Sequence, residues 1–324
     1  MNSGWPVNSG WPVNSGWPVN SGFTFRERVR PEDAGQGVLQ HHVLRHAHSD
    51  EATWRQRIEA GLVRVNGEIA SCDRVLRTGD EIAVERPPWS EPNAPDSFGV
   101  LFEDEDVLVA DKPSGLQVLP AGPFLDRTLV ALVRASAADR REAAPIHRLG
   151  RGTSGAILFG KSARARSDLS RQLRDGQLGK LYLAVVIASP PTSFVVTRAI
   201  GKVETSRGLV HAGSDAGRAA RTRGRRLRAL PGSRTLVAAW PITGRPDQIR
   251  IHLAWIGAPI AGDPLFAGGG RLLDARPGDC GYLLHSAGLR FAHPVGGHRV
   301  KVRSVPAWLG DMRLNEAASD VTAT

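Results

Sequence analysis

The chain has 324 residues, a length that favours two domains. Hydrophobic residues make up 41% of it, which is enough for a sizeable core and excludes wholesale disorder. Lys and Arg total 42 against 32 Asp and Glu, and the formal charge of +10 indicates an anionic partner such as nucleic acid. With two cysteines and no apolar run of about 18 residues, we expect a reduced cytoplasmic protein without a disulfide framework, a cysteine-based zinc site or a membrane span.

The first 22 residues form a tail built on a repeated hexapeptide. The unit Asn-Ser-Gly-Trp-Pro-Val occupies residues 2–7, 8–13 and 14–19, and a truncated copy starts at Asn20. The repeat is too short for helical or solenoid units, and it lacks the basic start and apolar core of a signal peptide. The sequence therefore predicts disorder over 1–22, with a tail whose tryptophans stack on bases as the alternative.

Residues 23–86 are predicted to form a small first domain. A short helix over Trp54–Ala60 precedes the strand-and-turn pattern Leu62–Gly67, and a second turn-and-strand pair covers Val75–Val84. This order resembles the small αL RNA-binding domain named after ribosomal protein S-four, whose helices present basic residues to structured RNA. The resemblance implies RNA contacts, with plain solvated charges as the alternative, at Arg45, Arg55, Arg57 and Arg64.

Four histidines fall within eight residues of this domain, at His41, His42, His46 and His48. His42 and His46 have helical spacing and could share a metal ion, but no acidic or cysteine partner beside them completes a site. We therefore predict no metal site and interpret the cluster as a solvated basic patch.

A Pro-rich stretch over 87–96 is interpreted as a semi-rigid linker to a large domain over 97–310, with a C-terminal tail over 311–324. Strand and helix patterns in the large domain do not alternate regularly, which favours an α+β fold with a mixed sheet. The predicted strands are Val107–Ala110, Gly155–Phe159, Leu181–Ile187 and Thr235–Trp240. The predicted helices are Leu129–Ala135, Ala165–Arg174 and Asp247–Ile256.

Two phosphate-binding patterns in the large domain are rejected. Gly155–Ser162 matches a P-loop letter for letter, and Gly150–Gly155 matches the dinucleotide-binding glycine pattern. However, Ala-Ile-Leu-Phe at 156–159 predicts a buried strand, whereas a phosphate loop needs amides that face the ligand and a helix that follows. We expect no nucleotide cofactor, and a nucleotide-dependent enzyme is excluded if this strand is present.

Five segments of the large domain carry recognisable motifs in a fixed order. They are VLFEDEDVLVADKPSGLQVLP at 100–120, HRLGRGTSG at 147–155, GKLYLAVV at 179–186, TGRPDQIRIHLAWIGAPIAGDPLF at 243–266 and LLHSAGLRFAHP at 283–294. In this order they resemble the RluA-type RNA pseudouridine synthases. The resemblance implies cofactor-free isomerisation of a uridine in ribosomal or transfer RNA, after the base has been pulled out of its stack.

The same resemblance implies roles for three residues. Tyr182 is the expected aromatic platform for the flipped base, Arg148 fills or props the vacated site, and Arg250 is the cation beside the catalytic carboxylate. At the decisive position the chain departs from the family, because the essential Asp of the His-Arg-Leu-Asp motif is replaced by Gly150. Glycine offers neither a nucleophile nor a base, so a catalytically inactive RNA-binding relative is the alternative function.

A second departure supplies an acid, since Asp247 stands where most members of the family have His before Gln-Ile-Arg. On a helix, Asp247 and Arg250 are three residues apart and share one face. Our hypothesis is that Asp247 provides the missing carboxylate. The alternative is that Asp247 only satisfies the helix dipole and pairs with Arg250.

An arginine-rich stretch adds six cations within 11 residues. Strand spacing would place Arg221, Arg223 and Arg225 on one face, either as a rail for RNA phosphates or as part of a solvated hairpin. The full set predicted to contact RNA here is Arg218, Arg221, Arg223, Arg225, Arg226 and Arg228.

Overall fold

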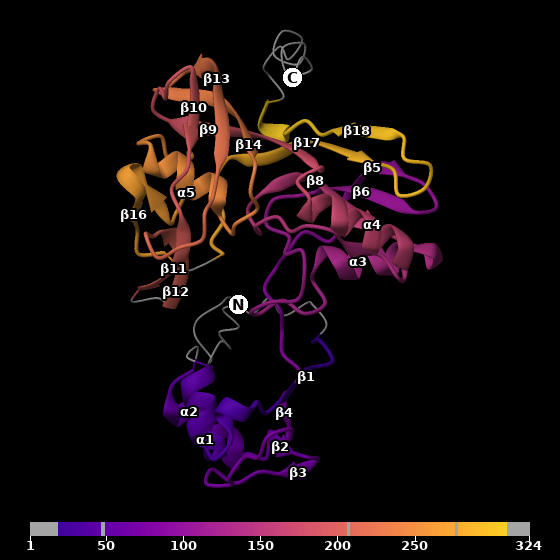
Figure 1. Ribbon diagram of the computed structural model, residues 1–324, viewed down its shortest axis with the longest axis vertical. Helices are drawn as coiled ribbons and strands as arrows, with labels where there is room; N and C mark the ends of the chain where they lie inside the picture. Colours follow the sequence, from indigo (N-terminus) through magenta and orange to yellow (C-terminus); the bar gives the residue numbers. More distant parts are fainter. Residues whose placement is uncertain (1–18, 47–48, 206–207, 276–277, 310–324) are drawn as a thin grey trace. The chain divides into compact units, whose positions relative to one another are not determined.

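The computed structural model describes residues 19–46, 49–205, 208–275 and 278–309 (Figure 1). The chain divides into two compact units. Unit 1 spans Met1–Asn93 and Pro120–Asp126, and unit 2 spans Ala94–Leu119 and Arg127–Thr324. The repeats before residue 19 and the predicted C-terminal tail lie outside the described residues. No helix in the described part of the chain combines the length and hydropathy needed to cross a membrane.

Unit 1 packs two helices on a four-stranded antiparallel sheet with the order β1-β4-β2-β3. Val38, Trp54 and Ile58 from the helices share one core with strand residues such as Val63 and Ile82. The elements are β1 (Phe23–Arg28), α1 (Val38–Arg45), α2 (Glu51–Glu59), β2 (Val63–Val65), β3 (Glu68–Ile69) and β4 (Glu81–Arg86), with a 3-10 turn over Pro31–Asp33.

Local sequence explains where these elements begin and turn. Helix α2 begins before Trp54 because the Asp50 carboxylate accepts a hydrogen bond of 2.8 Å from the Thr53 N–H and so caps the helix. Strands β2 and β3 are joined at Asn66-Gly67, whose φ values of 53° and 86° suit the tight hairpin turn. The expected helix and Asn-Gly turn are both present.

The segment predicted as a linker over 87–96 belongs largely to unit 1. Glu91 is only 7% exposed, and its carboxylate accepts hydrogen bonds from the N–H groups of Leu125 (2.9 Å) and Asp126 (2.8 Å) and from the Asn20 amide (3.0 Å). A buried carboxylate needs such donors. The predicted semi-rigid linker is therefore wrong at Glu91, which is buried within unit 1. The predicted disordered tail is wrong at its end, because Asn20 is buried and donates to Glu91.

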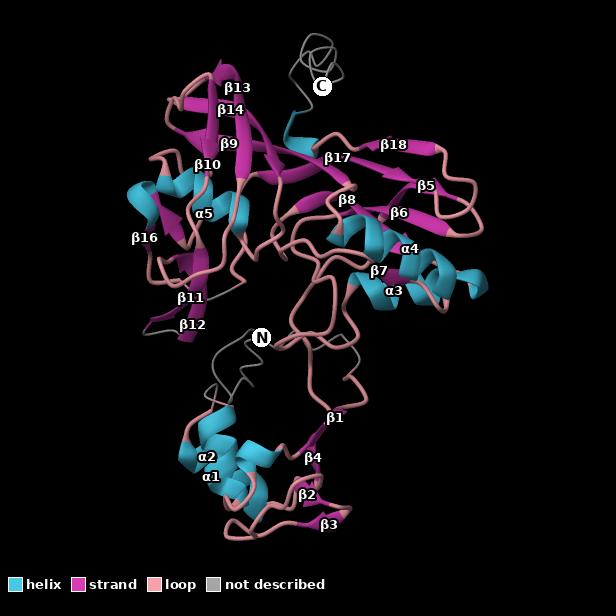
Figure 2. Cartoon of the chain, viewed as in Figure 1, coloured by secondary structure: helices cyan, strands magenta, loops and turns pink. Residues whose placement is uncertain are grey.

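Unit 2 is built on a ten-stranded mixed sheet (Figure 2). The strand path is β10-β13-β14-β9-β17-β8-β6-β5, with β18 on β17 and β7 on β8, and the β17–β8 pair is parallel. These strands are β5 (Gly99–Glu103), β6 (Val107–Lys112), β7 (Ala144–Pro145), β8 (Ser154–Gly160), β9 (Gly179–Ile187), β10 (Ser193–Val196), β13 (Thr222–Leu230), β14 (Arg234–Pro241), β17 (Leu284–Ala292) and β18 (Arg299–Arg303).

Helices and small hairpins complete unit 2. The helices are α3 (Leu129–Ser136), α4 (Ala163–Arg174) and α5 (Gln248–Trp255), and 3-10 turns cover Ala138–Arg140, Gly268–Gly270 and Ala307–Leu309. The hairpins pair β11 (Ile200–Thr205) with β12 (Gly208–Gly213) and β15 (Phe266–Ala267) with β16 (Arg271–Leu272). Every strand and helix predicted for the large domain is present, with ends shifted by at most two residues.

The buried strand β8 decides between two of the sequence interpretations. Its residues Leu158 and Phe159 are fully buried, and the strand pairs with β6 along its whole length. Alternating residues of these strands enter two different cores, one with α3 and one with α4, which explains their unbroken apolar run. The amides of Gly155–Gly160 are thus engaged in the sheet, and this stretch does not form the phosphate loop that the nucleotide-dependent alternative needs.

The Glu91 contacts generate a stability prediction. Glu91→Ala is expected to lower the free energy of unfolding by about 1–3 kcal/mol, because two buried backbone N–H groups lose their acceptor. Denaturant titration measures this loss, and Glu85→Ala at an exposed position serves as the control. If Glu91→Ala and Glu85→Ala are equally stable, the hydrogen bonds to Glu91 do not contribute to folding, and the segment behaves as the predicted linker.

Candidate active site

Strand β9 carries Tyr182 into the largest core of unit 2. Tyr182 is 7% exposed and lies opposite Ser286 of β17, with which its side chain is hydrogen bonded. Burial raises the pKa of Tyr182 to about 12, so the phenol stays protonated at neutral pH. The predicted platform is therefore a rigid, neutral ring.

The segment Asp-Lys-Pro-Ser-Gly holds the His-Arg-Leu-Gly loop in place. The Lys112 ammonium is buried and donates to the carbonyls of Arg151 (3.0 Å) and Leu116 (2.7 Å), while the Ser114 hydroxyl donates to the carbonyl of Gly152 (2.8 Å). Burial lowers the pKa of Lys112 to about 7. These contacts connect two motifs that are far apart in the sequence and fix the backbone on both sides of the loop.

Gly150 lies where Tyr282 leaves no room for a side chain. A Cβ atom at Gly150 would be 2.8 Å from the Tyr282 hydroxyl and 3.5 Å from the Thr153 hydroxyl. Tyr282 is 4% exposed, and its hydroxyl is 3.2 Å from Thr153 Oγ1. No motif in the sequence predicts a function for Tyr282, although it is one of only two tyrosines in the chain.

Arg250 joins Tyr282 to two carboxylates. Its guanidinium lies over the Tyr282 ring at 4.1 Å, holds Asp263 through two hydrogen bonds of 2.8 Å, and donates a third of 2.7 Å to Asp247. The side chains of Arg250 and Asp263 are 5% and 1% exposed, whereas that of Asp247 is 31% exposed. Asp247 is therefore the acid of this cluster that a ligand can reach.

Asp247 does not begin the helix as the sequence predicted. It precedes α5 with φ 52° and ψ 16°, in the left-handed region, and its side chain makes no capping hydrogen bond. This backbone costs a residue other than glycine about 1–3 kcal/mol, and such strain is often found at functional sites. Asp247 nevertheless lies at the N-terminus of α5, where the helix-dipole alternative requires it, and its pairing with Arg250 is present.

Arg148 is exposed and acts electrostatically on His211, on which Asp247 also acts. Burial lowers the pKa of His211 on β12, the Asp247 charge opposes that shift, and the Arg148 charge adds to it. Tyr182 and Tyr282 share one core cluster with Leu149, which adjoins both Arg148 and Gly150. Of the predicted site residues, Tyr182 lies in this core, and Arg148 and Gly150 adjoin one of its residues along the chain.

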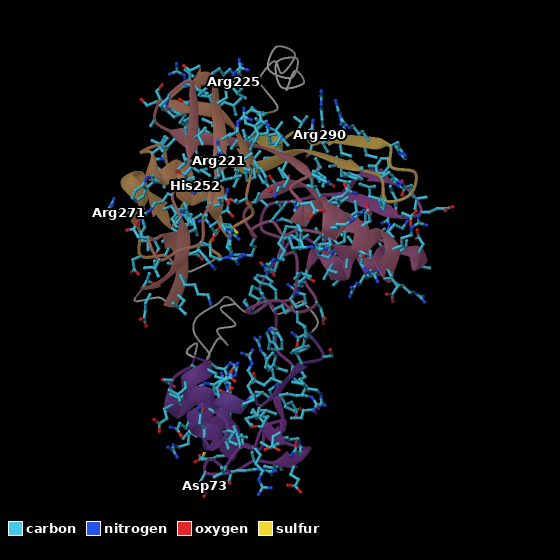
Figure 3. The ribbon with its side chains drawn as sticks, in the orientation of Figure 1. Asp73, Arg221, Arg225, His252, Arg271 and Arg290 are labelled. Atoms are coloured by element: carbon cyan, nitrogen blue, oxygen red, sulfur yellow. The ribbon has the colours of Figure 1, made fainter. Side chains whose placement is uncertain are left out.

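The exposed arginines at the start of β13 lie on the face of the sheet opposite to Tyr182. Tyr182 is in register with Ala239 of β14, and Ala239 with Gly224 of β13, so these three share a face. Thr222, two residues before Gly224, is on that same face and bonds to His252 of α5. We name Arg221, Arg223 and Arg225 the arginine stripe. Because they alternate with Thr222 and Gly224, they lie on the face of the strand opposite to α5. Figure 3 labels Arg221 and Arg225 on this part of the chain and His252 on α5.

The other arginines predicted to contact RNA differ in exposure and partners. Arg218 and Arg228 are exposed. Partners within the protein are Asp33 for Arg45, Glu51 for Arg55, Ser49 for Arg57, the Gly67 carbonyl for Arg64, and Ser189 for Arg226. The exposure and internal partners of these arginines do not test whether they contact RNA. Each predicted RNA contact therefore stays a prediction.

The histidine cluster of unit 1 is not the solvated basic patch that was predicted. His41 and His42 are 1% and 0% exposed, because helix α1 turns them toward the interior of unit 1. His48 lies outside the described residues. An acidic partner, absent from the neighbouring sequence, comes from strand β1 in the form of Glu27.

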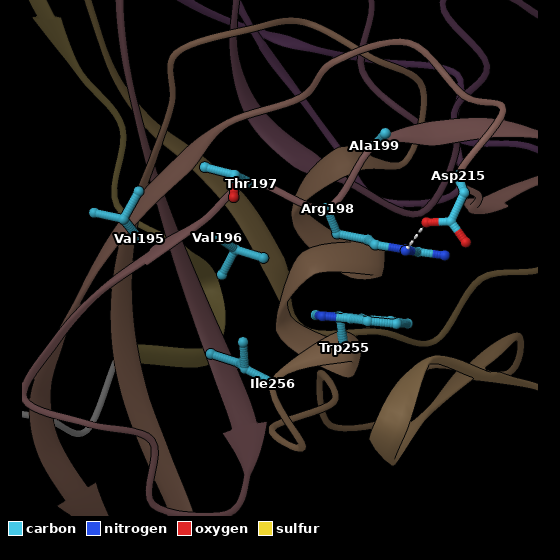
Figure 4. A pocket seen from close by; sticks show the side chains of 8 residues that line it. All are labelled: Val195, Val196, Thr197, Arg198, Ala199, Asp215, Trp255 and Ile256. Atoms are coloured by element: carbon cyan, nitrogen blue, oxygen red, sulfur yellow. Dashed lines mark hydrogen bonds and ion pairs between the residues drawn. The ribbon is translucent and has the colours of Figure 1, made fainter.

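A separate hollow of about 510 Å³ lies at the last turn of α5 (Figure 4). The Arg198 guanidinium lies 4.4 Å from the ring centroid of Trp255 and pairs with Asp215. The lining residues, none of them predicted as a site residue, are Val195, Val196, Thr197, Arg198, Ala199, Asp215, Trp255 and Ile256. This hollow therefore does not coincide with the Asp247–Arg250 cluster.

Comparison with known proteins decides the family. The family model described as RNA pseudouridylate synthase matches residues 106–255. An uncharacterized RNA pseudouridine synthase of Synechocystis sp. is 40% identical, covering 79% of this chain and 89% of the relative. The ribosomal large subunit pseudouridine synthase D of Xanthomonas campestris pv. campestris is 32% identical, covering 93% of this chain and 94% of the relative. The chain belongs to the RNA pseudouridine synthase family.

A solved structure supports the same assignment at the level of the fold. Human RNA pseudouridylate synthase domain containing 1 superposes with a TM-score of 0.56 at 21% identity, covering 72% of this chain and 98% of that one. The expected α+β class of the pseudouridine synthase domain is confirmed. This RNA pseudouridine synthase thus belongs to a family of RNA-modifying isomerases, with a glycine at the position of the expected acid.

The contact between Gly150 and Tyr282 gives a packing prediction for this synthase. Gly150→Ala is expected to cost about 1–3 kcal/mol of unfolding free energy, because the new methyl meets the Tyr282 hydroxyl. The same substitution should cost less in a Tyr282→Phe background, and denaturant titration of the four chains gives the coupling energy.

Gly152→Ala is the matched control for this cycle. Its methyl would lie 2.8 and 2.9 Å from ring carbons of Tyr282 that Tyr282→Phe retains, so its cost should be equal in both backgrounds. If Gly150→Ala lowers the free energy of unfolding equally in the wild-type and Tyr282→Phe backgrounds, the Tyr282 hydroxyl is not the group that a side chain at position 150 meets.

Proposed function

We propose that the chain converts a uridine in structured RNA to pseudouridine, with the Asp247 carboxylate as the catalytic acid–base group. One arrangement carries this proposal: Asp247 Oδ1 is 2.7 Å from Arg250 Nη1, and Arg250 lies on the ring of Tyr282. The hydroxyl of that ring fills the space at Gly150. Asp247 and Gly150 therefore both adjoin the pair that Arg250 forms with the Tyr282 ring.

The chemistry explains what this carboxylate would do. When the bond between uracil N1 and ribose C1′ breaks, positive charge develops at C1′, and a carboxylate stabilises it by charge or by forming a bond. After C5 has joined C1′, the proton on C5 must leave while N1 gains one, and a carboxylate base serves that transfer. The product is an isomer of the substrate, so no cofactor enters the reaction.

The remaining residues have supporting functions in this proposal. Tyr182 supports the flipped base from the α5 side of the sheet, and Arg148 enters the space that the base leaves. Arg250 fixes one carboxylate oxygen of Asp247, and among the described residues no hydrogen bond engages the second oxygen. That second oxygen is the one we assign to the substrate.

The substrate is proposed to be ribosomal or transfer RNA, and the name of the Xanthomonas relative supports the ribosomal choice. Unit 1 is proposed as an RNA-binding module of the S-four type, because its helices carry Arg55 and Arg57 beside the strand that carries Arg64. A cytoplasmic location stays a prediction, supported by two free cysteines, Cys72 and Cys280.

Asp247→Asn tests the catalytic proposal. The amide keeps the size and a hydrogen-bonding oxygen but cannot act as a base or nucleophile, so we expect a loss in rate of about 10⁴-fold or more with little change in RNA affinity. Pseudouridine mapping of cellular RNA with and without the protein identifies the target, and single-turnover assays on that RNA give the rate.

Asp215→Asn is the control, since Asp215 is another exposed carboxylate of unit 2 paired with an arginine. It should retain the full rate. A wild-type rate in Asp247→Asn would assign the chemistry to another group. RNA binding by the wild-type chain without any pseudouridine product would instead favour the inactive relative.

The arginine stripe has its own test, made on binding rather than on rate. If the three arginines contact RNA phosphates, replacing them with Gln should reduce the slope of log Kd against log salt by about 2, at about 0.7 per contact with single strands. The matched control replaces Arg299, Lys301 and Arg303, which alternate in the same exposed way on β18. An unchanged slope in the stripe variant would remove the stripe from the RNA footprint.

A further inference from the structure

Unit 1 contains a cluster of two histidines and a glutamate that pseudouridine synthesis does not use. Glu27 Oε1 on β1 is 3.1 Å from His41 Nε2 and 3.0 Å from His46 Nε2, and the three atoms all lie within 4.8 Å of one another. The His41 side chain is 1% exposed, and those of Glu27 and His46 are 17% and 19% exposed. The cluster is enclosed on one side and open to small solutes on the other.

The atom types, and the two separations from Glu27 Oε1, match a transition-metal site. Zinc binds imidazole nitrogen and carboxylate oxygen at about 2.0–2.2 Å in a tetrahedron, and two His with one Glu form a known zinc ligand set. Neighbouring ligand atoms in such a tetrahedron are about 3.3 Å apart. The two measured separations from Glu27 Oε1, 3.1 and 3.0 Å, are close to that value.

The backbone at the end of α1 produces this arrangement. His41 and His46 are five residues apart, so on a continuous helix their side chains would diverge by about 140°. His46 instead has φ −120° and ψ 60°, outside the helical region, where it ends α1. This local geometry lets the two imidazoles meet on a single carboxylate oxygen, which helical spacing alone would not predict.

A third histidine, His42, packs beside the cluster. His42 is fully buried, and its ring centroid is 5.5 Å from those of both His41 and His46. Its Nδ1 bonds to the Val38 carbonyl at 2.8 Å, so Nδ1 carries the proton and Nε2 carries a lone pair. That Nε2 is buried and has no hydrogen-bond partner among the described residues. This nitrogen is not among the three atoms that converge at Glu27, so His42 packs against the cluster and does not serve as one of its ligands.

We propose that Glu27, His41 and His46 bind one divalent transition-metal ion, with Zn²⁺ as the best match to this ligand set. The ion would fasten β1 to the end of α1. Strand β1 is an edge strand that pairs only with β4 and is mostly exposed, so it gains the most from such a link. Small domains are commonly stabilised by a structural metal.

Calorimetric titration of the full-length, chelator-treated chain with Zn²⁺ tests the proposal. We expect one equivalent to bind. Glu27→Gln keeps the shape and an oxygen but loses the charge, and His46→Gln removes one ligand. Each should weaken binding by more than about 100-fold, the upper range for loss of a group that only supports a ligand. His41 is too deeply buried for a clean substitution.

His298→Gln is the matched control, because His298 is an exposed histidine stacked on His293 at 4.8 Å beside Asp104. It should leave Zn²⁺ binding unchanged. Titration with Co²⁺ adds a spectroscopic readout: a tetrahedral visible spectrum in the wild-type chain that is absent in Glu27→Gln. Absence of both binding heat and spectrum in the wild-type chain would overturn the proposal. Retention of wild-type binding by Glu27→Gln and His46→Gln would overturn it as well.

Discussion

The buried Arg250 guanidinium is the constraint on which the candidate site depends. A buried cation is tolerated only where carboxylates and hydrogen bonds compensate for the lost water. Asp263 supplies a bidentate partner, Asp247 a third hydrogen bond, and the rings of Tyr282 and Phe266 lie 4.1 and 4.8 Å from the guanidinium carbon. Asp247 directly precedes α5, whereas Asp263 and Phe266 come from one later segment and Tyr282 from another, so one guanidinium connects α5 to both of those segments. The left-handed backbone of Asp247 is understandable in this setting, because it brings a third acceptor to the same cation.

The two departures from the family pattern are physically coupled through Tyr282. With glycine at position 150, the Tyr282 hydroxyl can occupy the space that a side chain on the loop would need. The ring then stacks on Arg250, whose remaining N–H holds Asp247. An acidic side chain at position 150 and the Tyr282 hydroxyl in its present place would exclude one another. The carboxylate of Asp247, before α5, is compatible with the present place of Tyr282. Under the proposed function, the glycine at position 150 and the carboxylate at Asp247 are thus both compatible with this one placement of Tyr282.

The sequence predicts those parts of the fold and site that depend on neighbours along the chain. The run Ala-Ile-Leu-Phe indicated the buried strand β8, and the three-residue spacing indicated the pairing of Asp247 with Arg250. Contacts between distant segments were not predictable in this way. Tyr282 reaches Gly150 only because β17 lies next to β8, and Glu27 reaches His41 only because of how β1 and α1 pack. The same limit explains the error at Glu91, whose hydrogen-bond donors are more than 30 residues away.

Strand register also separates binding from chemistry in unit 2. Thr222 and Gly224 face α5 and share the side of Tyr182, so the alternation of β13 places the arginine stripe on the opposite face. Electrostatic attraction in salt extends about 8–10 Å, far enough to draw RNA toward the unit but not to hold a flipped base on the other side of a sheet. Under the proposed function, the arginine stripe would therefore bind RNA phosphates on one face of the sheet, while the groups around Arg250 would position the uridine on the α5 side. RNA affinity and isomerisation would then rest on different side chains.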